Sequence, residues 1–367
     1  MATAPFRFFQ GLVQAFVQNH AKYGCKAWTA QDFELFGALG LGSGGFGPLY
    51  SVNFAEIVRL VVNGLESNQQ FYSAGLVSLV NAFAAQLPKD TIHLQQRVTA
   101  VSAKSGVLPH AICVTSVNSA GVTQTNHFDY AVIATTTRAM QVDMNLTEPP
   151  ANGQGGAAPI TNAEATAVQQ LHLMNSSKLF VLTKTKFWKS TPGMPENIQT
   201  DGLVRGLYCL DYPKSEHGVV LVSYTWGDDS TKYIAIKDPK ERFELLLRSL
   251  APYPELAPFV SKLRSETMDE HTTLIDWQDQ KHYYGAFKLN LPGQDLLNQD
   301  LYYQFMHSTN GIFLAGDSVG WCGGWIEGAL QTGMNAAAAV VKQACGDTGL
   351  GKNSPMTQNP KQYSYGP

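Results

Sequence analysis

Residues 311–340, GIFLAGDSVGWCGGWIEGALQTGMNAAAAV, decide the fold of this chain. Residues 312–315 are an apolar run, which predicts a buried strand. Gly316, Asp317 and a glycine-rich turn follow, and a helix is predicted to begin near Trp325. A helix start presents unpaired backbone N–H groups and the positive end of the dipole, which attract an anionic or electron-rich ligand. Since an acid after the strand can hold a hydroxyl-bearing ligand chain, the segment predicts half of a dinucleotide site.

The matching half is a glycine-rich turn, normally near residue 10, and no such turn stands there. Gly40, Gly42 and Gly45 formally satisfy GxGxxG. Their context argues against nucleotide binding, because the preceding AQDFELF is not a buried strand and Pro48 would interrupt a following helix. We therefore expect a structural loop, with a substrate-facing loop as the alternative.

Length and composition indicate a large globular enzyme. The 367 residues suffice for two domains with sizeable cores. Hydrophobic residues make up 44% and charged residues 15%, unlike a disordered or fibrous protein. A net charge of −3 provides no basic surface for nucleic acid. No apolar run reaches the roughly 18 residues of a membrane span, and the opening MATAPFRFFQ lacks the parts of a secretory signal.

Cysteine and histidine usage favours neither disulfides nor a metal. The five cysteines are scattered, odd in number and without a CxxC pair, so a reducing cytoplasm fits best. The nine histidines show neither HxxxH nor HExxH spacing, and we expect no metal site.

The pattern of apolar residues predicts alternating helices and strands, and hence an α/β or α+β fold. Helices are expected over residues 5–23, 54–65, 76–87 and 238–264. Strands are expected over residues 92–94, 111–116, 130–134, 178–182 and 219–226. Irregular structure is expected over residues 37–50, 149–162 and the tail 346–367.

Lys178, within MNSSKLFVLTKTKFW, stands in an apolar strand. It can lie at an edge with its ammonium group in water. Alternatively, it can be a desolvated lysine that holds a water at a redox centre. The same ambiguity applies to Trp277, Phe287 and Trp325, since ordinary core packing also explains aromatic residues. Residues 228–229, two aspartates after a strand, are interpreted as a turn.

Several segments look like parts of one known family. AGDSVGWCGGWIEGALQTG is similar to the C-terminal flavin-binding segment of the FAD-dependent amine oxidase superfamily. In SSKLFVLTKTKFW, Lys178 stands ten residues before Trp188, as the flavin-facing lysine of that family does. YSAGLVSLVNAFAAQL, IHLQQRVTAV and YAVIATTTRAM resemble the family's second contribution to the FAD domain. GLGSGGFGPLY, VSYTWGDDS and YYGAFKLNLPGQD favour its bacterial L-amino-acid branch, which includes tryptophan 2-monooxygenase, phenylalanine oxidase and lysine oxidase.

The resemblance implies an amine-oxidase-type two-domain fold. A Rossmann-like FAD-binding domain would be completed by another chain, beside a substrate-binding domain with a mixed sheet and helices. The implied segments are 1–70, a helical part of the substrate domain; 71–137, FAD-binding; 138–305, substrate-binding; 306–345, FAD-binding; and 346–367, a flexible tail.

The resemblance also implies FAD as the cofactor. Val98 would lie by the adenine, Asp317 would bind the ribityl or phosphate end, and the backbone of Ile326 would face the flavin pyrimidine. The other implied cofactor-binding positions are Gly316, Gly324, Trp325 and Ala329.

By the same resemblance, four residues would carry catalysis. Lys178 would hold a water near flavin N5 and assist reoxidation by O2, while Phe287, Trp325 and Trp277 would form aromatic walls. The α-hydride of an L-amino acid would pass to flavin N5, with positioning supplying most of the rate. Release of the oxidised product would give a 2-oxo acid, ammonia and peroxide, and its capture by oxygen chemistry would give an amide and CO2.

The chain departs from the family where the GxGxxG turn, the acid for the adenosine ribose and the arginine for the substrate carboxylate would stand. We therefore expect one subunit of a heteromeric enzyme whose partner supplies these parts, and Met1 favours a separately encoded partner. The alternatives are an amine or polyamine oxidase subunit and a non-catalytic, truncated paralogue that acts as a scaffold. The aromatic residues favour an apolar or aromatic substrate, while Asp211 and Glu216 would suit a basic one or lie in surface turns.

Overall fold

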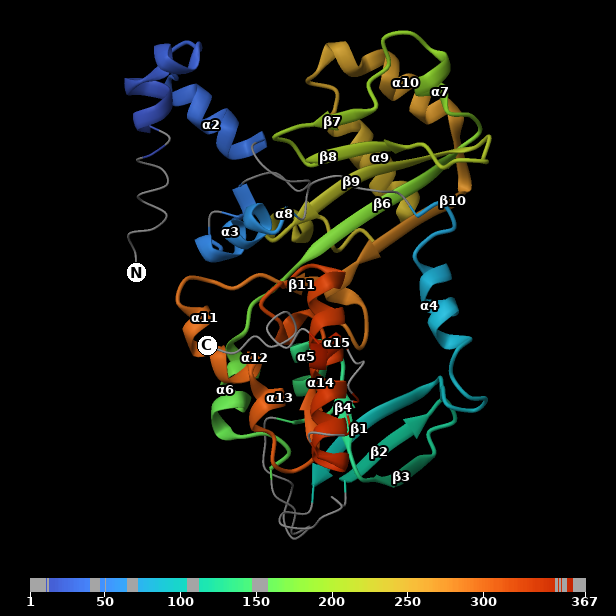
Figure 1. The fold of residues 1–367 in the computed structure, drawn as a ribbon. Helices are drawn as coiled ribbons and strands as arrows, with labels where there is room; N and C mark the ends of the chain where they lie inside the picture. The colour runs from blue at the N-terminus through green and yellow to red at the C-terminus, as the bar shows by residue number, and fades with distance from the viewer. Residues whose placement is uncertain are drawn as a thin grey trace. The chain divides into compact units, whose positions relative to one another are not determined.

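The chain divides into two compact units in a computed structural model (Figure 1). Unit 1 comprises Met1–Phe54 and Met174–Gln280, and unit 2 comprises Ala55–Leu173 and Lys281–Pro367. The structure describes residues 11, 13–39, 47–49, 51–64, 72–103, 112–146, 158–346, 349, 351 and 355–358. The GxGxxG match at Gly40, Gly42 and Gly45 lies outside these residues.

Unit 1 is built on a five-stranded antiparallel sheet with the order β10-β6-β9-β8-β7 (Figure 1). Its two longest inner strands are rich in β-branched and aromatic residues, which suit a pleated, half-buried surface. The strands are β6 (Ser176–Thr183), β7 (Asn197–Gln199), β8 (Gly206–Leu210), β9 (Gly218–Trp226) and β10 (Thr267–Asp276). Their register places Ser177 opposite Asp276, and Lys178 opposite Ile275 and Tyr224.

Two helices, α9 (Pro239–Ser249) and α10 (Ala257–Glu266), cover one face of this sheet with their buried residues. Alternate residues of β6, Leu179 and Val181, point into the same core. Asp238 caps α9 by accepting the N–H of Glu241, and a proline at the start fixes its entry. The other helical segments are η1 (Gln14–Gln18), η2 (His20–Tyr23), α2 (Ala30–Leu39), η3 (Gly47–Leu49), α7 (Phe187–Ser190), α8 (Asp228–Thr231), η4 (Pro254–Leu256) and η5 (Trp277–Asp279).

Unit 2 contains the strand, turn and helix predicted from residues 311–340. The apolar run forms β12 (Ile312–Leu314), which is fully buried and pairs in parallel with β4 (Ala131–Ile133). The helix that follows is α14 (Ile326–Cys345), with Trp325 at its N-cap. These predictions are confirmed.

The rest of unit 2 consists of two small sheets and a set of short helices. Strands β1 (Gln96–Ala103), β2 (Ile112–Asn118) and β3 (Thr123–Phe128) form an antiparallel sheet, and β5 (Leu173–Met174), at the boundary of the units, pairs with β11 (Phe287–Lys288). The helical segments are α3 (Phe54–Val62), α4 (Val77–Ala84), α5 (Thr137–Val142), α6 (Asn162–Gln170), α11 (Gln294–Leu297), α12 (Gln299–Tyr302), α13 (Gln304–His307), η6 (Asp317–Val319) and α15 (Pro355–Gln358).

The α/β fold class is confirmed, and several element predictions need correction. Residues 92–94 are not a strand, because Ile92 and Leu94 are exposed and Gln95 adopts φ 57°, outside extended backbone. The predicted helix over 238–264 is two helices separated by η4. The five predicted domain segments stay a prediction, and the compact units divide the chain at residues 54, 173 and 280. Within the described residues, no helix has the length and apolar character needed to cross a membrane.

Candidate functional site

The carboxyl ends of the two parallel strands of unit 2 meet at Gly316. This glycine follows β12 and has φ 114°, a conformation that L side chains rarely adopt. A Cβ at Gly316 would lie 3.6 Å from the carbonyl oxygen of Thr135, which follows β4. In open α/β sheets, ligands bind outside the carboxyl ends of such strands.

Asp317 fixes the turn between β12 and α14. Its Oδ2 accepts the backbone N–H groups of Lys288 and Gly324, each at 3.2 Å. The carboxylate therefore ties β11 to the glycine-rich turn, while Oδ1 makes no hydrogen bond to the described residues. The predicted contact of Asp317 with a ribityl or phosphate group stays a prediction.

The start of α14 is not capped by a side chain. Trp325 is extended at the N-cap (φ −129°, ψ 143°), and its indole, which has no acceptor atom, cannot cap the helix N–H groups. The hydroxyl of Thr332 joins the first turns to the strand end, since its Oγ1 accepts the N–H of Gly316 at 2.9 Å and lies 3.1 Å from the carbonyl oxygen of Ala329. The helix therefore offers first-turn N–H groups and the positive end of its dipole.

Aromatic side chains lie beside this helix start. A Cβ at Gly324, which has φ 80°, would lie 3.3 Å from Cδ2 of Phe287. Ile326, the first residue of the helix, is 57% exposed. The structure thus brings together the predicted residues Asp317, Gly324 and Phe287 at one end of α14.

A pocket of about 660 Å³ in unit 2 includes the predicted adenine-side residue Val98. Thr135, beside Gly316, also lines it, so the pocket reaches the ends of the parallel strands. On its rim, His282 Nδ1 and the hydroxyl of Tyr284 each lie 2.9 Å from a carboxylate oxygen of Asp143. Its other lining residues are Gln95, Gln96, Arg97, Val117, Asn118, Ser119, Gly121, Ala139 and Met144.

Sequence reasoning missed a buried lysine behind the glycine-rich turn. Lys288 is 0% exposed, and its Nζ lies 2.8 Å from the carbonyl oxygen of Gly320, 3.2 Å from the hydroxyl of Tyr302 and 3.3 Å from Oε1 of Glu56. A Cβ at Gly323 would lie 2.3 Å from Cε of Lys288, so only glycine fits there. A lysine within AFKLNL, in which apolar and polar residues alternate after Ala286, was the available signal.

Lys178 lies in unit 1, half-buried, on the face of β6 opposite the helices. Its Nζ is 4.3 Å from the centroid of the Tyr224 ring, a cation–π contact. Among the described residues, no carboxylate forms an ion pair with it. Burial lowers the pKa of Lys178 from its usual value, because desolvation penalises the ammonium form. These features favour the desolvated lysine over the snorkelling one, and its catalytic role stays a prediction.

Trp277 lies at the start of η5, immediately after the edge strand β10. Its neighbours on both sides are bonded to β6: the Asp276 carboxylate to the Ser177 hydroxyl at 2.6 Å, and the Gln278 side chain to the Ser176 N–H at 3.2 Å. Lys178 and Trp277 thus both belong to unit 1, whereas Val98, Gly316, Asp317, Gly324, Phe287, Trp325, Ile326 and Ala329 belong to unit 2.

The remaining polar candidates have structural partners or lie at the surface. Asp229 pairs with Arg205 at 2.7 Å and with Lys232 at 2.6 Å. It follows Asp228 at the start of the short helix α8, where the sequence predicted a turn. Asp211, which sequence alone left open, is exposed and pairs with a lysine at 2.6 Å. Glu216 is also exposed.

The chain is similar to a family of flavoproteins, as the sequence predicted. The profile of the family "Flavin containing amine oxidoreductase" matches residues 14–341. The tryptophan 2-monooxygenase of Pseudomonas savastanoi is 38% identical over 98% of this chain and 63% of its own length. The tryptophan 2-monooxygenase of Rhizobium radiobacter is 32% identical over 98% of this chain and 46% of its own length. A phenylalanine 2-monooxygenase precursor of Pseudomonas sp is 24% identical over 85% of the chain and 53% of its own length.

Solved structures support the same fold. Cyclohexylamine oxidase from Brevibacterium oxydans has a TM-score of 0.55 at 18% identity, covering 74% of this chain and 53% of that one. A putrescine oxidase variant has a TM-score of 0.56 at 15% identity with the same coverage. The chain therefore spans only part of the length of the proteins that it matches.

Proposed function

Because this chain belongs to the flavin containing amine oxidoreductase family, we propose that it is the FAD- and substrate-binding part of an L-amino-acid oxidase or monooxygenase. The observation that carries this proposal is the uncapped start of α14, a helix that Thr332 joins to Gly316 at the carboxyl end of β12. The Val98 pocket reaches the same strand ends at Thr135. An apolar or aromatic amino acid is the proposed substrate, with L-tryptophan first, because the similar proteins include tryptophan 2-monooxygenases.

The residues of unit 2 fit the flavin cofactor. The glycine at 316, with its positive φ, leaves room beside Thr135 for a ligand to approach the strand ends. The first turn of α14 offers backbone donors with no competing side chain. We propose that Gly316, Asp317 and Gly324 hold the cofactor at this turn, and that Val98 contacts its adenine end. The backbone at Ile326 and the turn at Ala329 complete the proposed binding set.

When bound, FAD accepts two electrons and the α-hydrogen of the amino acid and passes the electrons to O2. In the monooxygenase outcome, amino acid and O2 give amide, CO2 and water. In the oxidase outcome, amino acid, O2 and water give 2-oxo acid, ammonia and hydrogen peroxide. We propose the amide-forming reaction as the main one, because the similar proteins are called 2-monooxygenases.

The chain's own residues would support this reaction electrostatically and sterically. The dipole and free N–H groups at the start of α14 stabilise negative charge, which is worth more in a site that excludes water. The rings of Phe287 and Trp325 exclude water and orient an apolar side chain. Lys178, which has no carboxylate partner among the described residues, holds a water through its amine nitrogen. Trp277 supplies a further aromatic wall.

We propose that a further polypeptide segment, a strand–GxGxxG–helix unit from a partner subunit, completes the FAD site. Among the described residues, β4 pairs only with β12, and its central residue Val132 is 44% exposed, although parallel sheets are normally covered on both faces. Leu330 and Met334, one turn apart on α14, are 48% and 37% exposed. These three exposed apolar side chains, which we call the uncovered apolar surface, support such a partner. A cytoplasmic location stays part of the same proposal.

The test is reconstitution with a candidate partner. The chain is purified alone and with a co-expressed segment that carries GxGxxG, and the flavin absorption band is measured in each. We expect flavin to be retained only in the assembly, which then consumes O2 with L-tryptophan and releases the amide and CO2. Stoichiometric FAD and turnover in the chain alone would contradict the partner. Oxidation of tryptamine in preference to L-tryptophan would instead indicate an amine oxidase, and an assembly without flavin would indicate a scaffold.

A further inference from the structure

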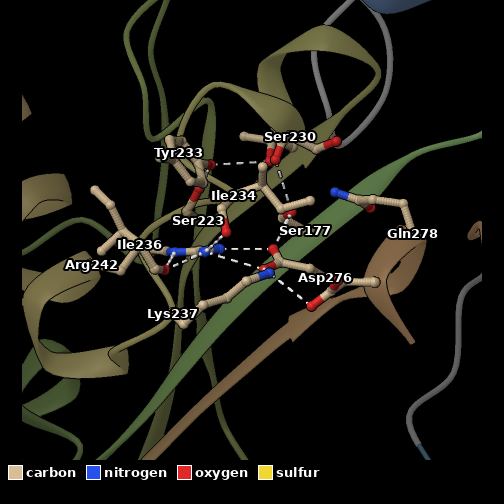
Figure 2. Close-up of polar contacts among 12 residues, drawn as sticks. Ser177, Ser223, Ser230, Tyr233, Ile234, Ile236, Lys237, Arg242, Asp276 and Gln278 are labelled. Carbon is tan, nitrogen blue, oxygen red and sulfur yellow. Dashed lines mark hydrogen bonds and ion pairs between the residues drawn. The ribbon is translucent and has the colours of Figure 1, made fainter. Parts of the chain in front are cut away.

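A buried ion pair lies on the helix-covered face of the sheet of unit 1, the face opposite to that of Lys178. Figure 2 shows the ion pair and its polar contacts. Arg242 of α9 and Asp276, the last residue of β10, are 1% and 4% exposed. The contact is bidentate: Nη1 lies 2.7 Å from Oδ1, and Nη2 lies 3.1 Å from Oδ2. Such a planar pair fixes orientation as well as distance.

The guanidinium group is also fixed from its other side. Arg242 Nε donates to the carbonyl oxygen of Ile236 at 3.0 Å, and Nη2 lies 3.5 Å from that of Ile234. Its Cζ lies 5.1 Å from the centroid of the Tyr233 ring. Figure 2 shows these groups converging on the guanidinium from the segment that precedes α9. These contacts hold the Arg242 guanidinium in one position, and Asp276 is bound to it there.

Asp276 also connects this ion pair to β6 through a side-chain hydrogen bond. Its Oδ1 lies 2.6 Å from Oγ of Ser177, which is 2% exposed and lies 3.1 Å from the carbonyl oxygen of Ser230. Two residues further on, Gln278 accepts the N–H of Ser176. The residues on both sides of Trp277 are thus bonded to the two residues before Lys178.

The backbone pairing beside Lys178 is irregular on one side of β6, the side that faces β9. The pairing of β6 with β9 shifts register between Leu179 and Phe180, directly after Lys178. The pairing of β6 with β10 is regular beside Lys178, from Thr272 to Asp276, and it is irregular only toward the far end of β6, between Met268 and Thr272. Bulges re-aim side chains and bend strands, so a side-chain contact next to the bulge adds a constraint on the direction of the residues beside it.

We propose that Ser177, Asp276 and Arg242, which we call the Asp276 clamp, are positioning residues that hold Lys178 and Trp277 in a fixed relation. A buried ion pair is weak evidence for stability alone, since apolar residues of similar volume pack at least as well. The clamp acts through its sequence neighbours Lys178 and Trp277, and its consequence for catalysis rests on the proposed function. Its effect on the geometry of these two residues is independent of that function.

The test compares two losses of one buried hydroxyl from β6. Ser177→Ala removes the contact with Asp276. Thr183→Val removes a hydroxyl that is 0% exposed and bonded to the carbonyl oxygen of Thr185 at 2.8 Å, at the far end of the same strand. Both variants keep the ion pair, so neither leaves a buried charge unpaired.

The readout is spectroscopic and uses the full chain. Tryptophans are labelled with 5-fluorotryptophan and lysines with ¹³C-methyl groups, and the Trp277 and Lys178 resonances are assigned by their loss in Trp277→Phe and Lys178→Arg. We expect Ser177→Ala to shift or split both resonances, whereas Thr183→Val leaves both in place. Unchanged Trp277 and Lys178 resonances in Ser177→Ala, or equal changes in both variants, would overturn the clamp.

A second arm measures flavin reoxidation in the FAD-loaded assembly. Ser177→Ala is expected to slow reoxidation about tenfold, because small misplacements of a catalytic group cost rate, and Thr183→Val is expected to leave it unchanged. If Lys178→Met does not slow this step, the proposed role of Lys178 fails, and the resonance comparison still decides the clamp. Slowing in Ser177→Ala without any resonance change would count against it.

Discussion

At the scale of single residues, the two informative lysines differ in how their charge is held. Lys288 is fully enclosed and has carboxylate, hydroxyl and carbonyl oxygen partners. Lys178 is half-buried and faces only an aromatic ring among the groups described. A buried, partnered cation is a structural element, whereas a desolvated cation without a counter-ion is a candidate for chemistry.

Replacing Lys178 by methionine should alter how stability depends on pH. Burial lowers the pKa of Lys178 below its ordinary value of 10.5, so the unfolded state binds more protons in the interval between the two values. The free energy of unfolding of the parent chain therefore rises with pH across this interval. The Tm difference, Lys178→Met minus parent, should fall as the pH is raised from about 7 toward about 10.5.

Calorimetry at several pH values measures this trend. Lys184→Met, which replaces an exposed lysine just beyond β6, is the matched control, and the Tm difference of Lys178→Met is compared with it at each pH. A difference for Lys178→Met that is constant or grows with pH would contradict the desolvated lysine.

Lys288→Met should destabilise unit 2 strongly. The change removes the buried cation of the Glu56 carboxylate, which is 4% exposed at the side chain, and leaves Arg59 at 3.2 Å as its partner. Breaking a buried pair costs up to about 3–5 kcal/mol, which is therefore the upper limit here. Urea unfolding measures the loss. Lys189→Met, which removes a surface pair with Glu196 whose side chains are 45% and 47% exposed, should cost at most about 1 kcal/mol.

The double variant Lys288→Met/Glu56→Gln distinguishes the ion pair from packing. It removes both charges, so it should recover part of the stability that Lys288→Met loses. No recovery would mean that the fit of the lysine stem against Gly323, rather than the charge, is what matters.

At the scale of elements, the turn before α14 is defined by backbone proximity. A Cβ at Gly328 would lie 2.1 Å from the carbonyl oxygen of Cys322, a distance that no side chain tolerates. Gly333, five residues along the same helix, has no heavy atom within 4 Å of its Cβ position. Gly328 therefore has no space for a side chain, whereas Gly333 on the same helix has open space.

Alanine at these positions should change stability in opposite directions. Gly333→Ala should stabilise the chain by about 1 kcal/mol, the difference in helix propensity. Gly328→Ala should displace the glycine-rich turn, lower the Tm and prevent flavin retention in the reconstituted assembly. Thermal unfolding and the flavin band measure both effects. A Gly328→Ala variant with parental Tm and flavin content would refute the importance of this contact.

Local patterns predicted the elements that determine the candidate site, and long-range contacts decided what the patterns missed. The strand before Gly316 and the helix after Trp325 could be predicted, because apolar runs and glycine-rich turns are recognised from neighbouring residues. Strands β3 and β10 were not predicted, since TQTNHF and TMDEHTTLID are largely polar. β3 gains its pairing in a hairpin with β2, and β10 gains its pairing from the distant strand β6. The partners of Lys288 and the Asp276 clamp span hundreds or tens of residues, which no periodicity encodes.

At the scale of the whole molecule, the uncovered apolar surface of unit 2 should be a binding surface and not a source of internal stability. Leu330→Lys, at a position 48% exposed, should change the free energy of unfolding by less than about 0.5 kcal/mol and abolish capture of the partner segment. Met306→Lys, also in unit 2 and 51% exposed, is the control and should leave capture intact. Co-purification and urea unfolding provide the two measurements. Equal capture by the parent chain, Leu330→Lys and Met306→Lys would mean that the partner binds a different surface.

The interleaving of the two units in the sequence has a consequence for synthesis on the ribosome. Unit 1 needs residues on both sides of 55–173, and its last strand, β10, ends at Asp276. During translation, residues 1–54 therefore emerge before the strands β6 to β10 of the same unit, and residues 55–173 of unit 2 emerge in between. Neither unit can be produced by simple truncation at a single point, so fragments cloned in this way should be recovered as aggregated chains.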